Sequence, residues 1–312
     1  MRGINKTRKV LMLWVLVMRS PLLSAMAVIV SLAPGLSQAS TLDPLSILSN
    51  ASAVVLGDFT TRGTTHVEGP VYVGGNLNSS SPFTYNQDAM PGVDIGGVQG
   101  GLVVGGDVNG NLQKAGNAPG AAQIGGSYNG SSNTGGLTLN QNVSGLQVNE
   151  MRALFEGLSS DLAGLDQTTG ASFDTTQNRR NVKSGADRGD GIAVLNLNPS
   201  EALALLSATG AQNVDLFLNP SVRGFFINIA GTDFTGANSI TAQLFQNQIL
   251  QSRFAILNFY EATAIKFDSN ANGTILAPYA KVESAPGGMN GVVVSSSFVL
   301  DGELRPVFDK DG

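Results

Sequence analysis

The sequence predicts a mainly β protein, a right-handed β-helix or β-solenoid with irregular rungs and one long flanking α-helix at about residues 149–165. Three observations lead to this fold class. The chain holds 39 Gly in 312 residues, and 13% of its residues are charged, against about 25% in a typical globular domain. Short apolar runs alternate with turns rich in Gly, Asn and Ser, which is typical of short strands. A single stretch of clear helical periodicity stands among them.

Residues 1–39 are predicted to be a secretory signal peptide, because a basic start is followed by apolar runs at 10–18 and 22–32. Small residues place the cleavage site after Ala39. Arg19 interrupts the apolar stretch, which leaves Met1 or Met18 open as the start. The same Arg19 disfavours a membrane anchor over 10–32, since a charge would lie near its centre.

The remaining residues, 40–312, are expected to form one acidic domain. The predicted signal carries five Lys/Arg and no acidic residue, which leaves 13 basic and 23 acidic side chains and a net charge of −10. This balance argues against nucleic acid and anionic membranes as partners, because both bind basic patches. No later apolar stretch is long enough to span a bilayer.

A small motif recurs three times in the first half, at residues 73–78, 104–109 and 124–129. Each copy consists of an apolar residue, Gly-Gly, a small polar residue, an apolar residue and Asn. A glycine pair permits positive φ, so these segments are expected to turn the corners of a solenoid. The unequal spacing departs from a fixed-period repeat and predicts rungs joined by loops of different length. None of the copies matches a nucleotide-binding glycine motif followed by a helix.

Two helices are predicted. In residues 147–166 apolar side chains recur at helical spacing, with Asn149 as the expected N-cap and Glu150 in the first turn. The apolar stripe of this helix is expected to cover the side of a sheet. A shorter helix is expected from Pro199 to about Ser207, because Asn198 and Glu201 form a capping pattern around Pro199.

Residues 167–190 are expected to form a polar loop. The loop contains a local basic cluster made of Arg179, Arg180, Lys183 and Arg188. It also contains the tripeptide Arg188-Gly189-Asp190, for which a solvated loop is favoured over recognition by an integrin.

The second half is rich in strand candidates, at residues 192–197, 214–218, 224–229, 253–259, 264–267, 273–277 and 291–300. Phenylalanine is concentrated there and is expected to form core stacks rather than a platform for sugars. The residues concerned are Phe217, Phe225, Phe226, Phe234, Phe245, Phe254, Phe259 and Phe267.

Two groups of residues have a chemical pattern, and for both the structural interpretation is favoured. His66 and Glu68 would share one face of a strand, but no second His or Cys completes a metal or deaminase site. The string Asp268–Gly273 matches the start of a calcium loop, whereas position twelve is Tyr279 instead of Glu; whether it binds calcium stays open. With no Cys and one His, the sequence predicts no catalytic, cofactor-binding or metal-ligating residues, no cofactor, and no enzyme.

Several segments together resemble the choice-of-anchor A domain family, an adhesive domain of bacterial surface proteins, over about residues 45–308. The opening of that family is similar to residues 56–59, 66–69 and 73–76, and its close is similar to 256–259, 273–278, 291–293 and 302–304. The resemblance implies a secreted, non-enzymatic β-helical domain with a side helix and a role in adhesion or the extracellular matrix. The sorting signals that follow such domains have no counterpart before Gly312, so the mode of anchoring stays open.

The predicted function is therefore a secreted or cell-surface adhesin-like domain that binds an extracellular protein or glycan. Two alternatives are a β-helical polysaccharide lyase or hydrolase, which would need clustered acids in a groove, and an ice-binding-like protein. The ice-binding alternative predicts a flat face of regularly spaced threonines, and the threonines of this chain do not recur at rung spacing.

Overall fold

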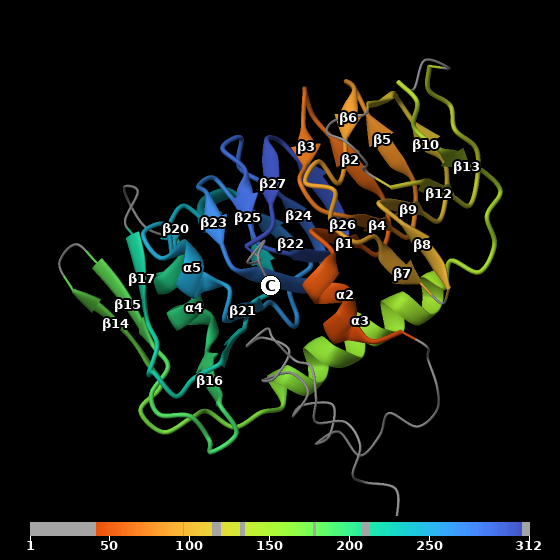
Figure 1. Cartoon of the computed structure of the whole chain (residues 1–312). Helices are drawn as coiled ribbons and strands as arrows, with labels where there is room; N and C mark the ends of the chain where they lie inside the picture. The colour runs from red at the N-terminus through yellow and green to blue at the C-terminus, as the bar shows by residue number, and fades with distance from the viewer. Residues whose placement is uncertain are drawn as a thin grey trace, which may run out of the picture.

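The computed structural model describes residues 42–95, 97–113, 120–131, 135–176, 179–207 and 213–307. The predicted signal peptide, 1–39, lies outside the described residues. Successive turns of the chain stack with nearly all of their strands parallel and hydrogen-bonded, and a full turn visits three sides in the same order (Figure 1). The predicted solenoid with irregular rungs is confirmed in this sense, while its right hand stays a prediction.

Side 1 contains ten strands. From one end to the other they are β13 (Leu139–Asn140), β12 (Ala122–Ile124), β9 (Leu102–Val104), β4 (Val71–Val73), β1 (Ala53–Val55), β26 (Val293–Leu300), β24 (Thr274–Glu283), β21 (Ala255–Asn258), β18 (Gly224–Ile229) and β16 (Ile192–Leu197).

Side 2 continues from side 1 around a bend, because β24 and β26 are long enough to cross both sides and their register shifts between Ala277 and Lys281. Its other strands are β10 (Val108–Asn109), β5 (Leu77–Ser79), β2 (Phe59–Thr61), β22 (Ala264–Lys266) and β19 (Asp233–Phe234). Sides 1 and 2 together form one sheet of 15 strands.

Side 3 is a separate sheet of ten strands. In spatial order they are β11 (Leu112–Gln113), β6 (Phe83–Thr84), β3 (His66–Val67), β27 (Glu303–Arg305), β25 (Met289–Asn290), β23 (Ala271–Asn272), β20 (Gln243–Leu244), β17 (Asn213–Phe217), β15 (Arg179–Lys183) and β14 (Ser172–Thr176). All neighbouring pairs are parallel except β14 and β15, which form an antiparallel hairpin at the end of the sheet.

The two ends of the described chain meet in the middle of the solenoid. On side 1, β1 is followed toward one end of the solenoid by β4, β9, β12 and β13. The chain then runs back along the outside of side 1 and begins again at the other end with β16. The last turn closes on the first, because β26 pairs with β1 and β2, and β27 pairs with β3. In Figure 1 the blue C-terminal strands accordingly lie between the orange and the green strands.

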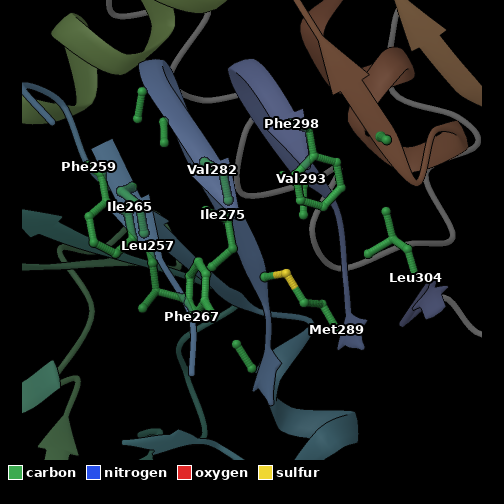
Figure 2. Close-up of a cluster of buried hydrophobic side chains, with 14 of the residues drawn as sticks. Leu257, Phe259, Ile265, Phe267, Ile275, Val282, Met289, Val293, Phe298 and Leu304 are labelled. Carbon is green, nitrogen blue, oxygen red and sulfur yellow. The ribbon is translucent and has the colours of Figure 1, made fainter. Parts of the chain in front are cut away.

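The interior is packed with apolar side chains from all three sides. In the helix-covered part of side 1 both faces of the strands are buried, so Ala53 and Val55 point inward while Val54 points outward against the helices. This explains the continuous apolar runs in the sequence. Aromatic rings stack across turns, with the Phe59 and Phe298 centroids 5.4 Å apart. Figure 2 shows one part of this core, formed by residues of β21, β22, β24 and β26 and their neighbours.

Most of the predicted core phenylalanines are confirmed. Six are buried, namely Phe225, Phe226, Phe234, Phe245, Phe259 and Phe267. Phe254 is only half-buried, and Phe217 is 49% exposed. Phe217 departs from the prediction because the alternation of β17 turns Val214 and Leu216 into the core and leaves this ring outside.

The predicted long helix is confirmed as α3 (Val148–Ala163), which lies along side 1 together with the short α2 (Pro44–Asn50) (Figure 1). The prediction of Asn149 as N-cap is wrong. The chain enters the helix through Gln147 in the left-handed region, at φ 49°, so Asn149 already lies inside the first turn. The Tyr72 hydroxyl donates to the carbonyl of Leu146 at 3.2 Å and anchors this entry.

The length of α3 suits the five steps between the turns that it crosses. Its start lies beside β4 and β9, where Val148 adjoins Gly74 and Gly105, and its end lies beside β18. At 1.5 Å per residue a 16-residue helix spans about 24 Å. Five strand spacings of about 4.8 Å span the same distance, so the helix returns the chain to the far end of the solenoid.

A row of asparagines fastens the second half of α3 to side 1. Asn196, Asn228 and Asn258 are register neighbours on β16, β18 and β21, and their carboxamides are bonded in series at 2.8 and 2.9 Å. Each carboxamide also donates to one carbonyl of the helical segment, in turn Leu165, Leu162 and Ser159. These contacts give the buried amides of Asn228 and Asn258 hydrogen-bond partners and attach the C-terminal end of the helical segment to three neighbouring strands.

The glycine corners are confirmed as corners, but the expected positive φ is not found there. Gly74, Gly75, Gly105 and Gly106 are absent from the residues with positive φ. Glycine is needed instead because neighbouring turns approach closely: a Cβ on Gly74 would lie 2.6 Å from the carbonyl oxygen of Leu56. The turn-to-turn offsets of 18, 31 and 20 residues confirm the irregular period.

Other local elements both match and extend the predictions. The capping pattern is confirmed by α4 (Pro199–Leu206), in which Asn198 and Glu201 form a capping box. The predicted loop 167–190 is wrong over 172–176 and 179–183, where β14 and β15 pair with each other and extend side 3 by the pairing of β15 with β17. Elements that were not predicted include α2, the antiparallel hairpin β7 (Val93–Ile95) and β8 (Val98–Gly100), the 3-10 turn Gly236–Asn238, the single-turn α5 (Ile249–Ser252) and the short strands β19, β20, β25 and β27.

We expect Gly105→Ala to lower the free energy of unfolding by about 1–3 kcal/mol, because overpacking costs this much in a packed interior. The new Cβ would lie 2.9 Å from Cγ2 of Val148 and against the carbonyl of Gly74. Urea denaturation measures the change. The control is Gly157→Ala in α3, where a Cβ has open space and should raise stability by about 0.5–1 kcal/mol; equal effects would contradict the close-approach argument.

Asn258→Ala should lower the free energy of unfolding by about 2–3 kcal/mol, because it leaves buried acceptors on Asn228 and Ser159 without their donor. Asn140→Ala is the matched control: Asn140 lies in the same side 1 row, is exposed, and bonds Gln123 at 3.0 Å. Its removal should change stability by less than about 0.5 kcal/mol. Thermal or urea unfolding measures both variants. Equal losses of stability would contradict the prediction that the buried hydrogen bonds of Asn258 make the larger contribution.

Candidate binding faces

The three sides differ in what covers them. Side 1 is covered by α2 and α3, and α4 turns Ala202, Leu205 and Leu206 into the interior. Strands of sides 2 and 3 alternate between core residues and polar outward residues, which is the pattern of a sheet with one face toward water. Sides 2 and 3 are therefore the candidate binding faces of the described chain.

A charged group lies on side 3 around the single histidine. His66 is in register with Glu303 of the last turn, and its Nε2 lies 3.1 Å from Glu303 Oε1. Arg305 forms ion pairs with Glu303 and with Glu68, the latter at 3.6 Å. The closure of the solenoid therefore brings Glu303 rather than Glu68 to the imidazole, and Glu68 pairs with Arg305 instead. The structural interpretation of the His66 and Glu68 pattern stays a prediction.

Side-chain amides occupy the centre of side 3. Asn290 donates to Asn272 Oδ1 at 2.6 Å, and Asn272 donates to the carbonyl of Phe245 at 2.9 Å. The two asparagines end β25 and β23 at positions 18 residues apart. Sequence reasoning did not single out this pair, although the apolar-Asn step repeated at one turn length is a signal that could have found it.

The calcium-like string Asp268–Gly273 forms the corner between sides 2 and 3. The Asp268 carboxylate accepts from Ser239 Oγ at 2.5 Å and lies 2.9 Å from Lys266 Nζ, and these two donors lower its pKa. Asn272, the fifth residue of the string, is fully buried. No three His, Asp or Glu residues lie close enough to hold a metal ion within the described ranges.

The predicted basic cluster is divided by the fold. Arg179 pairs with Asp215 at 3.1 Å and Lys183 with Asp174 at 2.7 Å on the outer face of side 3. Arg180 instead donates to the carbonyl of Ala204 in α4. Arg188 lies apart from them in the loop before β16, so the structure provides no single basic patch here.

The tripeptide Arg188-Gly189-Asp190 lies in a loop, as expected. Arg188 and Gly189 are exposed, and Gly189 takes the left-handed region at φ 94°. The Asp190 carboxylate accepts from the backbone N–H of Ile192 at 2.9 Å. This aspartate therefore stabilises the turn that leads into β16.

Side 2 carries an amide row and a charged group. Asn78, Asn109 and Asn129 of successive turns are bonded in series at 3.0 and 2.9 Å. In the middle of this side Glu283 of β24 lies 2.8 Å from Lys281 and 3.7 Å from Arg62, which follows β2. The hydrogen bond from Lys281 is the main cause that lowers the pKa of Glu283.

These features define a class of protein: a parallel β-solenoid scaffold with one helix-covered side and two polar sides. Residues 44–305 match the family model described as "Putative Ice-binding-like adhesive domain", and the chain belongs to this family. No match is found among curated proteins. In the described residues no helix is both long and apolar enough to cross a membrane.

Three solved structures resemble the chain at low scores. An ice-binding protein from the Antarctic ascomycete Antarctomyces psychrotrophicus is 12% identical, with a TM-score of 0.39 and 87% of this chain and 100% of that chain covered. An ice-binding protein from an Antarctic biological consortium is 12% identical, with a TM-score of 0.34 and coverage of 86% and 92%. A Shewanella frigidimarina ice-binding protein domain is 13% identical, with a TM-score of 0.32 and coverage of 83% and 95%.

Lys183→Gln should raise the pKa of Asp174 toward its ordinary value of 3.8, because the hydrogen bond from Lys183 is the main cause that lowers it. The ion pair favours the ionised carboxylate, so its contribution is present above pH 3.8 and is lost as the pH falls through the lowered pKa. Carboxyl-carbon NMR titration measures this. Lys281→Gln is the control and should raise the pKa of Glu283 alone; an unchanged Asp174 titration in Lys183→Gln would contradict the assignment.

Proposed function

We propose that the chain is an extracellular adhesive domain that binds an extended, hydrated ligand through side 3, without catalysis. The observation that carries the proposal is the arrangement of side 3: ten strands in one sheet, with polar outward side chains and with the long helix placed on another side. Membership in an adhesive-domain family supports a binding role.

The chemistry of side 3 favours a polar ligand of repetitive form. Outward amides and ion pairs follow one another from turn to turn at the strand spacing of about 4.8 Å. The nine steps between its ten strands extend over about 43 Å. Many weak polar contacts over this length suit a polymer, because each contact adds little and the sum gives affinity. An extended glycan or a matrix protein meets this description.

The cellular placement belongs to the same proposal. We propose that residues 1–39 direct secretion and that 40–312 act as one domain outside the cell, on its surface or released. The adhesive family supports this placement. The net charge of −10 for residues 40–312 disfavours nucleic acid as ligand. The more specific assignment to choice-of-anchor A domains stays a prediction.

Ice binding is the second candidate, because the family description includes it. A long parallel sheet is also a regular surface. The distribution of side chains on side 3 is less favourable. Among its ten described strands, threonine occurs as Thr84 on β6, which is nearly buried, and as Thr175 and Thr176 on β14 at the end of the sheet. Charged pairs flank the amide centre, whereas the ice-binding hypothesis predicts rows of threonine.

Two matched variants test the face. Asn290→Arg on side 3 removes the hydrogen bond to Asn272, and Asn109→Arg on side 2 removes the bonds to Asn78 and Asn129. Both variants add the same bulky cation. The purified protein is applied to an array of glycans, matrix proteins and bacterial cells. We expect Asn290→Arg to weaken binding about tenfold or more, as for a blocked central contact, and Asn109→Arg to bind as the unaltered chain does.

Thermal hysteresis of the same samples separates the two candidates. Ligand binding without hysteresis supports adhesion, and hysteresis that Asn290→Arg abolishes supports ice binding through the same face. Weakening by Asn109→Arg alone would move the binding surface to side 2, and an array without any bound ligand would contradict adhesion.

A further inference from the structure

One aromatic ring stands exposed on the polar face of side 3. Phe217 ends β17 and is 49% exposed, and the other large exposed apolar side chains of the described chain are Ile249 and Tyr279. The preceding residue, Leu216, is held by the side chain of Gln248. The Leu216 N–H donates to Gln248 Oε1 at 2.6 Å, and Gln248 Nε2 donates to the Leu216 carbonyl at 2.8 Å. The backbone beneath the ring is therefore fixed.

The ring lies at the corner of a polar array, here called the hairpin platform, which the last three strands of side 3 build. Register places Lys183 beside Phe217, and Asn181 between Asp174 and Asp215. Successive outward residues of one strand lie about 6.8 Å apart and neighbouring strands about 4.8 Å apart. The hairpin platform consists of Asp174, Arg179, Asn181, Lys183, Asp215 and Phe217.

The polar groups of the hairpin platform are oriented by contacts with one another. Asp174 accepts from Lys183 and from Asn181, both at 2.7 Å. Asp215 is nearly buried and is paired with Arg179, whose side chain is 70% exposed. The two carboxylates are thus balanced by two cations, and the exposed heads of Lys183 and Asp174, at 48% and 41%, stay within reach of a ligand.

We propose that the hairpin platform is a subsite for a neutral glycan, in which one pyranose ring stacks on Phe217 and its hydroxyls bond Lys183, Asp174 and Asn181. This inference rests on the proposed adhesive function of side 3. A sugar has an apolar C–H face and a polar rim, and the negative face of an aromatic ring attracts the C–H side. Ionised carboxylates and amides are strong acceptors and donors for the rim.

The surroundings of the ring favour this occupant over others. The four charges of the hairpin platform sum to zero, which favours a neutral ligand over an anionic one. A protein partner would be expected to cover a larger apolar core, whereas Phe217 stands among charged and amide groups on β14, β15 and β17. A neutral hexose polymer suits one exposed aromatic ring, Phe217, that is surrounded by charged and amide side chains.

The test compares Phe217→Ala with Phe217→Trp and with Tyr279→Ala in the full chain. Tyr279 is an aromatic of similar exposure, 42%, on β24, and serves as the matched control. Calorimetry and NMR with soluble cello- and manno-hexaose, and with an oligouronate, measure affinity. We expect Phe217→Ala to weaken neutral-hexaose binding about tenfold, Phe217→Trp to keep it, and Tyr279→Ala to leave it unchanged.

The outcomes separate this proposal from the adhesive function itself. Hexaose binding that Phe217→Ala leaves intact while Asn290→Arg weakens it overturns the subsite and keeps side 3 as the adhesive face. Stronger binding of the oligouronate, or a protein ligand in place of any glycan, overturns the neutral-glycan assignment. Binding of no array ligand overturns both. Unfolding midpoints of the variants show whether a loss reflects folding, and because Phe217 is exposed we expect them to match the unaltered chain.

Discussion

The hydrogen bonds between the first and the last turn of the chain are the contact on which the rest of the structure depends. Val54 lies beside Val294 on side 1, Thr60 beside Val299 on side 2, and Val67 beside Leu304 on side 3. All three sides are continuous only because of this junction. The residues joined come from opposite ends of the described chain, so the pairing carries a large loop-closure entropy that the packed interior must offset.

The junction also determines what the long helix has to do. The chain forms its first turns from the middle of the solenoid outward and then resumes at the far end with β16. The helix α3 must therefore cross the strands β26, β24 and β21, which come later in the sequence. The polar and apolar parts of the outward row on side 1 match this path: Val54, Tyr72 and Leu276 are buried against helices, and the asparagines Asn228 and Asn258 bond the helix carbonyls. The helix thus serves as return connection, cover of side 1 and guide for the register of three strands.

Covering side 1 decides where function can reside. The apolar outward residues of that side are buried against the helices. Sides 2 and 3 therefore remain the candidate binding faces. On side 3 the junction assembles His66, Glu303 and Arg305 from both ends of the chain, while the hairpin β14–β15 builds the hairpin platform at the other end of the same sheet. The first group joins two adjacent strands and the second joins three.

Local pattern in the sequence determined the solenoid class, the irregular corners, many of the strands, the long helix and the capped α4. Each of these depends on residues close in the chain, such as Asn198 and Glu201 in the capping box. The tertiary structure decided the partners. It paired His66 with Glu303 instead of Glu68, formed strands over 172–176 and 179–183, and left Phe217 outside the core. It also gave the corner glycines their reason, close approach between turns rather than positive φ. These outcomes depend on which turns become neighbours, and no spacing along the chain specifies that.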